Sequence, residues 1–196
     1  MTIDEICEKY KIYNYTVNSD GTIDVVGNVV LFNEGLTEIP LRFNKVSDNF
    51  SCSKNKLTSL KGCPKWVGGD FNCNRNQLTS LEFGPEYVGS SFDCSYNQLS
   101  DLTGSPKEVG INFFSYDNKK LTNPNGCSEK IGEQLICVNT PLGSIFTGVD
   151  QFFLHAFKFY KIIKNDTVNL KRLKYVMNLY DKRINLDKIQ KYYRLV

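Results

Sequence analysis

The sequence predicts an α+β fold in which short repeated turns stack into a solenoid and form a parallel β ladder. Two observations lead to this prediction. Three consecutive units of similar sequence begin at Phe50, Phe71 and Phe92, so equivalent residues recur every 21 positions. Non-repetitive segments flank these units, and the segment after residue 146 has the apolar spacing of helices. We therefore expect stacked turns with a cap at each end.

Length and composition place the chain among globular proteins. Its 196 residues suit one domain, or one domain with a small appendage, and 41% of them are hydrophobic. That fraction can fill a core, which excludes intrinsic disorder. No apolar run approaches the roughly 18 residues that span a bilayer. The first residues, MTIDEICEKYK, lack the basic and apolar regions of a secretion signal, and with unpaired cysteines they predict a cytoplasmic protein.

Residues 1–28 are expected to form the N-terminal cap, a helix followed by a β-hairpin. Thr2 and Glu5 have the spacing of a capping box, in which each side chain bonds the backbone N–H of the other residue at a helix start. The segment YNYTVNSDGTIDVV then alternates around Asp20 and Gly21, which predicts two strands joined by a tight turn.

Residues 29–146 are expected to form the repeats. Seven columns agree across the three central units, and this agreement fixes the period. Degenerate copies lie on both sides, as is typical of outer turns, which meet a cap or solvent. The columns are Phe50, Phe71 and Phe92; Cys52, Cys73 and Cys94; Asn55, Asn76 and Asn97; Leu57, Leu78 and Leu99; Leu60, Leu81 and Leu102; Pro64, Pro85 and Pro106; and Val67, Val88 and Val109.

Each unit reads F-x-C-x-x-N-x-L-x-x-L, the core pattern of a leucine-rich repeat with phenylalanine and cysteine in two leucine positions. Alternation places Phe and Cys on one face of a short strand, and strands of successive units stack at about 4.8 Å. The asparagine is expected to bond backbone groups of the turn, and the leucines to fill the interior. The proline and the exit at Gly68, Gly69, Gly89 and Gly110 predict a short extended return rather than a helix.

Residues 147–196 are expected to form two or three helices that close the solenoid. The segments GVDQFFLHAFKFYKIIK, DTVNLKRLKYVMNLY and NLDKIQKYYRL each have helical apolar spacing. This end of the chain is basic. From Asp150 to Val196 there are 11 Lys and Arg against 4 Asp and Glu, a net charge of +7, whereas the rest, with 13 against 17, has a net charge of −4.

The repeat resembles that of the leucine-rich-repeat-like proteins encoded by tailed bacteriophages. NQLTSLEFGPEYVGSSFDC is similar to their unit NQLTSLEGxPKxVGGDFxC, and YTVNSDGTIDVVGNVVLFNEGLTEIP is similar to their lead-in. The resemblance covers roughly residues 12–146. It implies the solenoid fold and a viral origin, and by analogy with other solenoids it implies protein binding. The chain would then act in the cytoplasm of the host bacterium.

The cysteines and the single histidine do not have the spacing of a catalytic or metal site. The repeat cysteines are 21 residues apart, and none has the C-x2-C spacing of a zinc site. We expect buried free thiols, with disulfides between adjacent turns as the alternative. His155 lies in an aromatic helical segment, which favours a partly buried histidine, or one on the capping side, over a catalytic base. We therefore expect no enzyme, no metal and no cofactor. The cysteines are Cys7, Cys52, Cys63, Cys73, Cys94, Cys127 and Cys137.

Large side chains on the outward face of the strands form the first candidate site. Polar residues dominate the middle of this face, as expected for a solvated sheet. Aromatic and arginine side chains are the usual anchors of protein interfaces, so they predict a concave protein-binding face. The alternative is that the caps cover the outer aromatic residues. The candidate residues are Phe32, Lys54, Arg75, Tyr96, Phe114 and Tyr116.

The basic C-terminal segment forms the second candidate site. Basic residues interleaved with aromatic ones can bind phosphates and stack on bases, which predicts binding to nucleic acid. An acidic protein would use the same charges, and amphipathic capping helices with lysine outside give the same pattern. The candidate residues are Lys158, Lys161, Lys171, Arg172, Lys188 and Lys191.

A non-catalytic protein-binding module is the function that the sequence favours, with an unidentified protein as partner and no membrane. A phage factor that binds a host protein is one form of this hypothesis. Binding to nucleic acid or to an acidic partner through the C-terminal helices is an alternative, and a virion or assembly component is another. The sequence indicates no oligomeric state.

Overall fold

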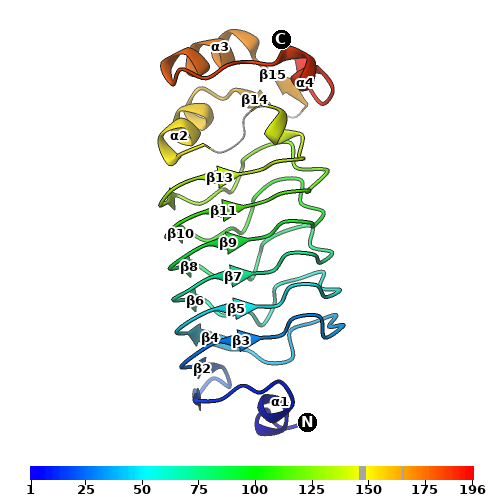
Figure 1. The fold of residues 1–196 in the computed structure, drawn as a ribbon, viewed down its shortest axis with the longest axis vertical. Helices are drawn as coiled ribbons and strands as arrows, with labels where there is room; N and C mark the ends of the chain where they lie inside the picture. The colour runs from blue at the N-terminus through cyan, green and yellow to red at the C-terminus, as the bar shows by residue number, and fades with distance from the viewer. Residues whose placement is uncertain (146–148, 165) are drawn as a thin grey trace.

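The computed structural model describes residues 1–145, 149–164 and 166–196. Its turns stack along one axis, with helix α1 at one end and helices α2, α3 and α4 at the other (Figure 1). The predicted α+β solenoid with a parallel β ladder and a cap at each end is confirmed. The predicted boundary between residues 146 and 147 lies outside the described residues.

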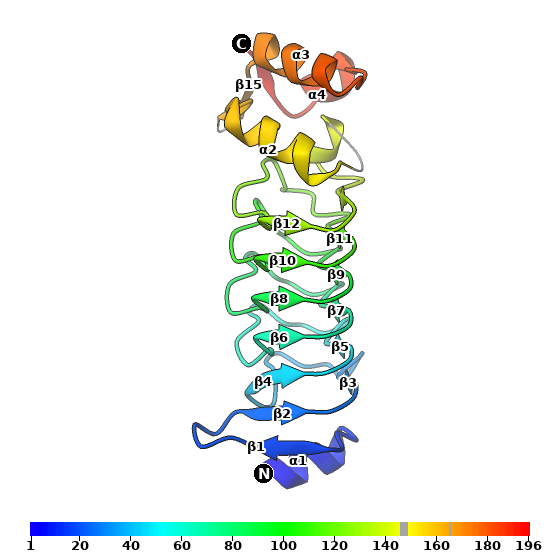
Figure 2. The same cartoon turned by 90° about the vertical axis from the view of Figure 1, so that its left-hand side faces the viewer.

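Two parallel sheets run along the solenoid, whereas the sequence predicted one ladder (Figure 2). Each turn contributes one strand to each sheet, so the extended return of the repeat is itself a strand. Sheet A contains β1 (Tyr15–Val17), β2 (Ile23–Val25), β4 (Phe43–Val46), β6 (Trp66–Val67), β8 (Tyr87–Val88), β10 (Glu108–Val109) and β12 (Lys130–Ile131) in that order. Sheet B contains β3 (Val29–Val30), β5 (Phe50–Ser51), β7 (Phe71–Asn72), β9 (Phe92–Asp93), β11 (Phe113–Phe114) and β13 (Leu135–Ile136).

The N-terminal cap has the predicted helix and hairpin. In α1 (Ile3–Lys9) the backbone N–H of Glu5 donates to Thr2 Oγ1 at 3.2 Å, and the N–H of Thr2 donates to Glu5 Oε2 at 2.8 Å. Strands β1 and β2 form the antiparallel hairpin, and β2 then pairs with β4 in parallel. The hairpin therefore covers the edge that sheet A would otherwise expose at this end.

Stacked phenylalanines fill the centre of the solenoid. Phe50, Phe71 and Phe92 are fully buried, and the ring centroids of neighbours lie 5.4 Å apart with planes within 7°. The parallel register of sheet B sets this stacking, because it pairs each phenylalanine with the one a turn away. Cys52 and Cys73 are also fully buried, as the alternation of the strand predicted.

The repeat asparagines satisfy the backbone of two turns at once. Asn76 Nδ2 donates to the carbonyl oxygens of Cys52 and Cys73 at 3.0 and 3.1 Å, and its Oδ1 accepts the N–H of Leu57 at 2.9 Å. Each bond links the asparagine turn to itself or to the preceding turn. The predicted role of the asparagine in the turn is therefore confirmed. Asn55, Asn97 and Asn118 make the same set of bonds.

A glycine column marks where adjacent turns approach most closely. A Cβ atom on Gly89 would lie 2.1 Å from the carbonyl oxygen of Gly68 in the preceding turn. No side chain fits at that distance without a shift of the backbone, so glycine is required here for space. Gly68, Gly110 and Gly132 have contacts of the same kind, at 2.1, 1.9 and 1.8 Å.

The C-terminal cap contains the predicted helices and a small sheet that was not predicted. The prediction for the last segment was partly wrong, because only residues 186–190 of it are helical and its end is a strand. Two contacts attach the cap to the solenoid. Val149 forms an antiparallel bridge with Leu135, and the hydroxyl of Tyr193 donates to the carbonyl oxygen of Thr122. The elements are η1 (Leu142–Ser144), α2 (Gln151–Phe159), β14 (Ile163–Lys164), β15 (Thr167–Val168), α3 (Leu170–Leu179), α4 (Leu186–Gln190) and β16 (Arg194–Leu195).

None of the helices in the described ranges is long and apolar enough to cross a membrane.

Candidate binding face on sheet B

The outer face of sheet B holds the first candidate site. The turns stack along a straight axis in both views (Figures 1 and 2), and binding on this face stays a prediction. Phe114 lies within β11, whereas Phe32 and Tyr116 lie two residues beyond the ends of their strands. Lys54, Arg75 and Tyr96 follow at the corner where each turn leaves the sheet.

The corner residues have left-handed backbone conformations. The φ angles of Lys54, Arg75 and Tyr96 are 53°, 53° and 55°. This conformation costs a non-glycine residue about 1–2 kcal/mol. The asparagine of each turn offsets that cost, because Asn55 Nδ2, directly after Lys54, donates to the carbonyl oxygens of Cys52 and Ser53 in the same turn at 3.0 and 3.3 Å. The corner side chains are thus held in a fixed column outside the sheet.

Two of the exposed aromatic residues are each covered by a cation from a neighbouring turn. Lys54 Nζ lies 5.0 Å from the ring centroid of Phe32, and Arg75 Cζ lies 4.1 Å from that of Tyr96. Phe32 and Tyr96 nevertheless keep 45% and 42% of their surface exposed. The hypothesis that the caps cover these rings is therefore wrong for both residues.

The remaining two candidates pack against each other. The ring centroids of Phe114 and Tyr116 lie 5.6 Å apart with a 35° angle between the planes, and both residues are half-buried. The six predicted residues thus form three pairs along one face. The Tyr116 pKa is raised by burial and by the charge of Asp93, so the phenol stays neutral at physiological pH.

Hydrogen-bonded polar side chains form the middle of the face. Ser51 Oγ and Ser53 Oγ lie 3.0 Å apart, and Asn74 Nδ2 donates to Asp93 Oδ2 at 2.7 Å. Asn72 Oδ1 accepts the N–H of Asn74 at 3.0 Å. These bonds join the small polar side chains of the central turns to one another and to the backbone of the sheet.

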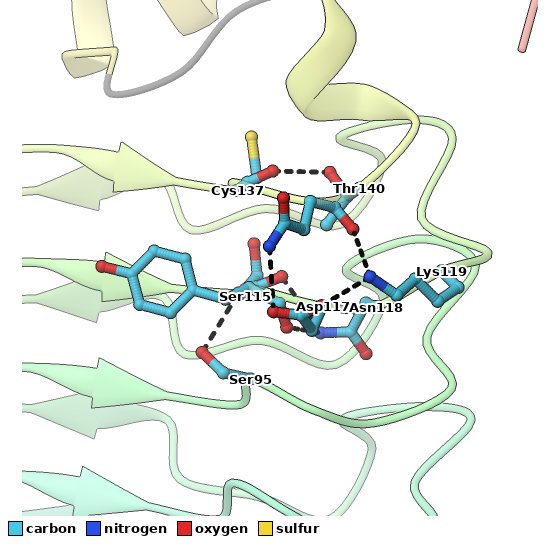
Figure 3. Close-up of polar contacts among 9 residues, drawn as sticks. Ser95, Ser115, Asp117, Asn118, Lys119, Cys137 and Thr140 are labelled. Carbon is cyan, nitrogen blue, oxygen red and sulfur yellow. Dashed lines mark hydrogen bonds and ion pairs between the residues drawn. The ribbon is translucent and has the colours of Figure 1, made fainter. Parts of the chain in front are cut away.

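Asp117 occupies the corner position one turn after Tyr96 and forms an ion pair with Lys119 (Figure 3). Lys119 Nζ donates to Asp117 Oδ1 at 2.5 Å, and Asn139 Nδ2 donates to Oδ2 at 3.4 Å. The hydrogen bond from Lys119 is the largest influence on the Asp117 carboxyl and lowers its pKa. The carboxylate is therefore ionised and already paired, and is less available to an incoming ligand than Lys54 or Arg75.

A second aromatic column, on the outside of sheet A, was missed in the sequence. Trp66 and Tyr87 stack with centroids 5.6 Å apart and planes 7° apart, and Lys45 Nζ lies 4.4 Å from the Trp66 centroid. The indole is therefore contacted by Lys45 and by Tyr87, from the turns on either side of its own. The signal was present in the sequence, because these residues immediately precede the valine column.

The structure brings together only part of the predicted basic patch. Lys158, Lys161 and Arg172 line one cleft between the solenoid and the C-terminal cap, together with Lys164, which was not among the candidates. The remaining candidates are exposed on α3 and at α4, outside the residues that line this cleft. They are Lys171, Lys188 and Lys191.

All seven cysteines are buried free thiols, as predicted. Burial raises the pKa of the Cys73 and Cys94 thiols well above the usual value, and raises that of Cys137 to about 12. Thiols with such pKa values carry almost no thiolate at neutral pH. His155 is exposed on α2, so the expectation that it is partly buried is wrong, although it does belong to the cap. Within the described ranges, no group of three His, Cys, Asp or Glu residues could hold a metal ion.

Comparisons with protein-family models, with curated proteins and with solved structures found no match to this chain.

Proposed function

We propose that this protein binds another protein through the outer face of sheet B and does not act as an enzyme. The observation that supports this most is the pair of exposed rings, Phe32 and Tyr96, each held by a cation from a neighbouring turn. Aromatic residues and arginine are the side chains that most often dominate protein interfaces. Here each ring already contacts a cation of the same chain, and a side chain held in place before binding costs less entropy on binding.

Two features of the chain argue against nucleophilic catalysis. Its thiols are all buried, burial raises the pKa of Cys94 and Cys137, and the thiolate is the form that reacts. The chain's one histidine is exposed on the C-terminal cap, whereas a catalytic base normally lies beside the nucleophile that it activates. A binding role needs neither group.

The repeat residues support a proposal about origin as well. We infer a leucine-rich-repeat-like protein of a tailed bacteriophage, on the resemblance of the unit NQLTSLEFGPEYVGSSFDC to repeats of that group. The partner is then a protein of the infected bacterium, encountered in its cytoplasm. A role in the virion or its assembly is the alternative, and it would require a partner encoded by the phage.

An affinity pull-down from bacterial lysate, followed by mass spectrometry, tests the binding face. Tyr96→Ala is the informative variant, and Phe83→Ala is its control. Both residues are exposed aromatics in left-handed conformations, with φ of 55° and 66°, but Phe83 lines a groove that includes Lys65 and Glu86. We expect Tyr96→Ala to lower partner recovery about tenfold, the usual effect of truncating an interface anchor, and Phe83→Ala to leave it unchanged.

Nuclease treatment of the lysate separates the alternatives. A protein that is recovered equally with and without nuclease, and that is lost with Tyr96→Ala, supports the proposal. Recovery that disappears on nuclease treatment would assign binding to nucleic acid instead. Equal losses with Tyr96→Ala and Phe83→Ala would show that the outer face of sheet B is not the site.

A further inference from the structure

We propose that the cleft between the solenoid and the C-terminal cap binds an organic phosphate of nucleotide size. The cleft has a volume of about 690 Å³. It is lined by residues 123–125 of the last complete turn and by residues of the C-terminal cap, which are Phe157, Lys158, Lys161, Ile162, Ile163, Lys164, Thr167, Asn169, Arg172 and Val196. It is distinct from the outer face of sheet B, so the proposal does not depend on protein binding there.

Four cations point to an anionic ligand. No Asp or Glu side chain lines the cleft, although Val196, the last residue of the chain, does, and none of the four cations belongs to an ion pair within the described part of the chain. Like charges gathered in a partly enclosed space repel one another, and an anion relieves that repulsion. The cations are Lys158, Lys161, Lys164 and Arg172.

The hydrogen bonds of these cations leave donors for a ligand. Lys158 is half-buried, and its ammonium group donates to the carbonyl oxygen of Cys127 at 3.2 Å. Arg172 Nη1 donates to the carbonyl oxygen of Tyr160 at 3.4 Å. Both acceptors are neutral, so the positive charges are oriented by the protein without being neutralised. Phosphate oxygens accept several such charged hydrogen bonds at once.

Apolar surface in the same cleft indicates that the phosphate carries an organic group. Pro124, Ile162 and Ile163 line the cleft beside the cations, and Asn123 and Asn125 add amide groups. Sites for small organic ligands combine an apolar lining with a few polar groups in volumes of about 300–1,000 Å³. A nucleotide has both parts, because its phosphates suit the cations and its base suits the apolar wall.

The side chains, and not a helix end, supply the proposed site. The first turn of α3 is already capped, since the N–H of Leu170 donates to a Val196 oxygen at 2.8 Å and that of Arg172 to Asn169 Oδ1 at 2.9 Å. A ligand in the cleft would contact α2, α3 and the last complete turn together. It would therefore hold the cap against the solenoid.

Calorimetric titration with ATP at low salt tests the site. The informative variant is Lys161→Gln with Arg172→Gln, and the control is Lys188→Gln with Lys191→Gln. Both pairs remove two positive charges from exposed positions of the cap, but only the first removes them from the cleft. We expect the first pair to weaken ATP binding about a hundredfold, roughly tenfold for each charged hydrogen bond, with little change for the control.

Three results would overturn the proposal: no saturable ATP binding by the wild type, equal losses for the two pairs, and ATP binding no tighter than inorganic tripolyphosphate. Equal losses would reveal only the diffuse field of a basic cap. Circular dichroism confirms that each variant is folded, and Lys164→Gln, at an exposed strand position, provides a second cleft variant if the first pair fails to fold.

A 5′-phosphorylated single strand distinguishes the two sources of a nucleoside phosphate. Tighter binding of the strand than of ATP, lost with Lys161→Gln and Arg172→Gln, would assign the cleft to a strand end. Tighter binding of ATP would assign it to a free nucleotide. Strand binding that depends instead on Lys188 and Lys191 would contradict the cleft as the site.

Discussion

At the scale of single residues, several side chains occupy left-handed backbone conformations that their residue types rarely adopt. The column that contains Gly62, Gly104 and Gly126, with φ of 96°, 86° and 73°, has Phe83 in one turn with φ of 66°. Lys54, Arg75 and Tyr96 form a second left-handed column. None of these side chains favours that conformation, so the sequence alone did not predict it. In the second column, the backbone N–H groups of Lys54 and Arg75 donate to carbonyl oxygens of the following turn at 3.0 Å, and these bonds help to hold the conformation.

Gly89→Ala should be among the most destabilising substitutions in the chain. Its Cβ would lie 2.1 Å from the Gly68 carbonyl oxygen, so the ladder must move apart, and we expect a loss of more than about 3 kcal/mol in the free energy of unfolding. Gly21→Ala is the control, since no atom lies within 4 Å of its Cβ and only its φ of 77° is unfavourable, at about 1 kcal/mol. Urea denaturation followed by circular dichroism measures both, and equal losses would contradict the steric argument.

At the scale of elements, the asparagine column joins the turns through buried hydrogen bonds. Asn76→Ala leaves the carbonyl oxygens of Cys52 and Cys73 and the N–H of Leu57 without these partners. We expect a loss of about 2–4 kcal/mol in the free energy of unfolding. Asn74→Ala, on the solvated face of the same turn, should cost less than about 1 kcal/mol. Thermal and urea unfolding of both variants tests this difference, and similar losses would show that the column is not structural.

The elements that the sequence predicted are those with many residues or repeated columns. Sheet B, the asparagine turns and α1 were predicted because Phe50, Asn55 and the Thr2 capping box are strong local signals. The strands of sheet A beyond the β1–β2 hairpin were not, because a strand such as Trp66–Val67 carries one buried valine between a proline and a glycine and has no F-x-C alternation, so this stretch was interpreted as an extended return. Strands β14, β15 and β16 were not predicted either, because two residues are too few for alternation to be seen. The contacts of Lys54 with Phe32 and of Arg75 with Tyr96 were not predicted, because they depend on how adjacent turns align with each other.

At the scale of the whole molecule, each turn contacts mainly the turns beside it, so stability should vary along the axis. The rate at which each buried thiol becomes reactive can measure this variation in local stability. Cys7 lies in the N-terminal cap and Cys137 near the other end, while Cys73 lies between. Under mild urea we expect Cys7 and Cys137 to react with iodoacetamide before Cys73, because Cys7 lies in a cap helix and Cys137 in the turn that meets the other cap, where the regular stacking of identical turns ends.

Peptide mapping by mass spectrometry gives the rate for each thiol. The seven cysteines should react fully in concentrated denaturant, which provides the reference. A single common rate under mild urea would instead indicate that the molecule opens as one cooperative unit.

The regular stacking of the turns also means that the number of turns sets the length of the molecule. The central turns repeat the same two strands and the same contact at Gly68, Gly89 and Gly110, so a further 21-residue unit could be inserted between β7 and β9 without altering either end. Each such insertion would lengthen the molecule by about 4.8 Å, the spacing of neighbouring strands. The distance between the two caps therefore changes by one strand spacing for each repeat unit. Gain or loss of whole units during evolution would change this distance without altering the caps.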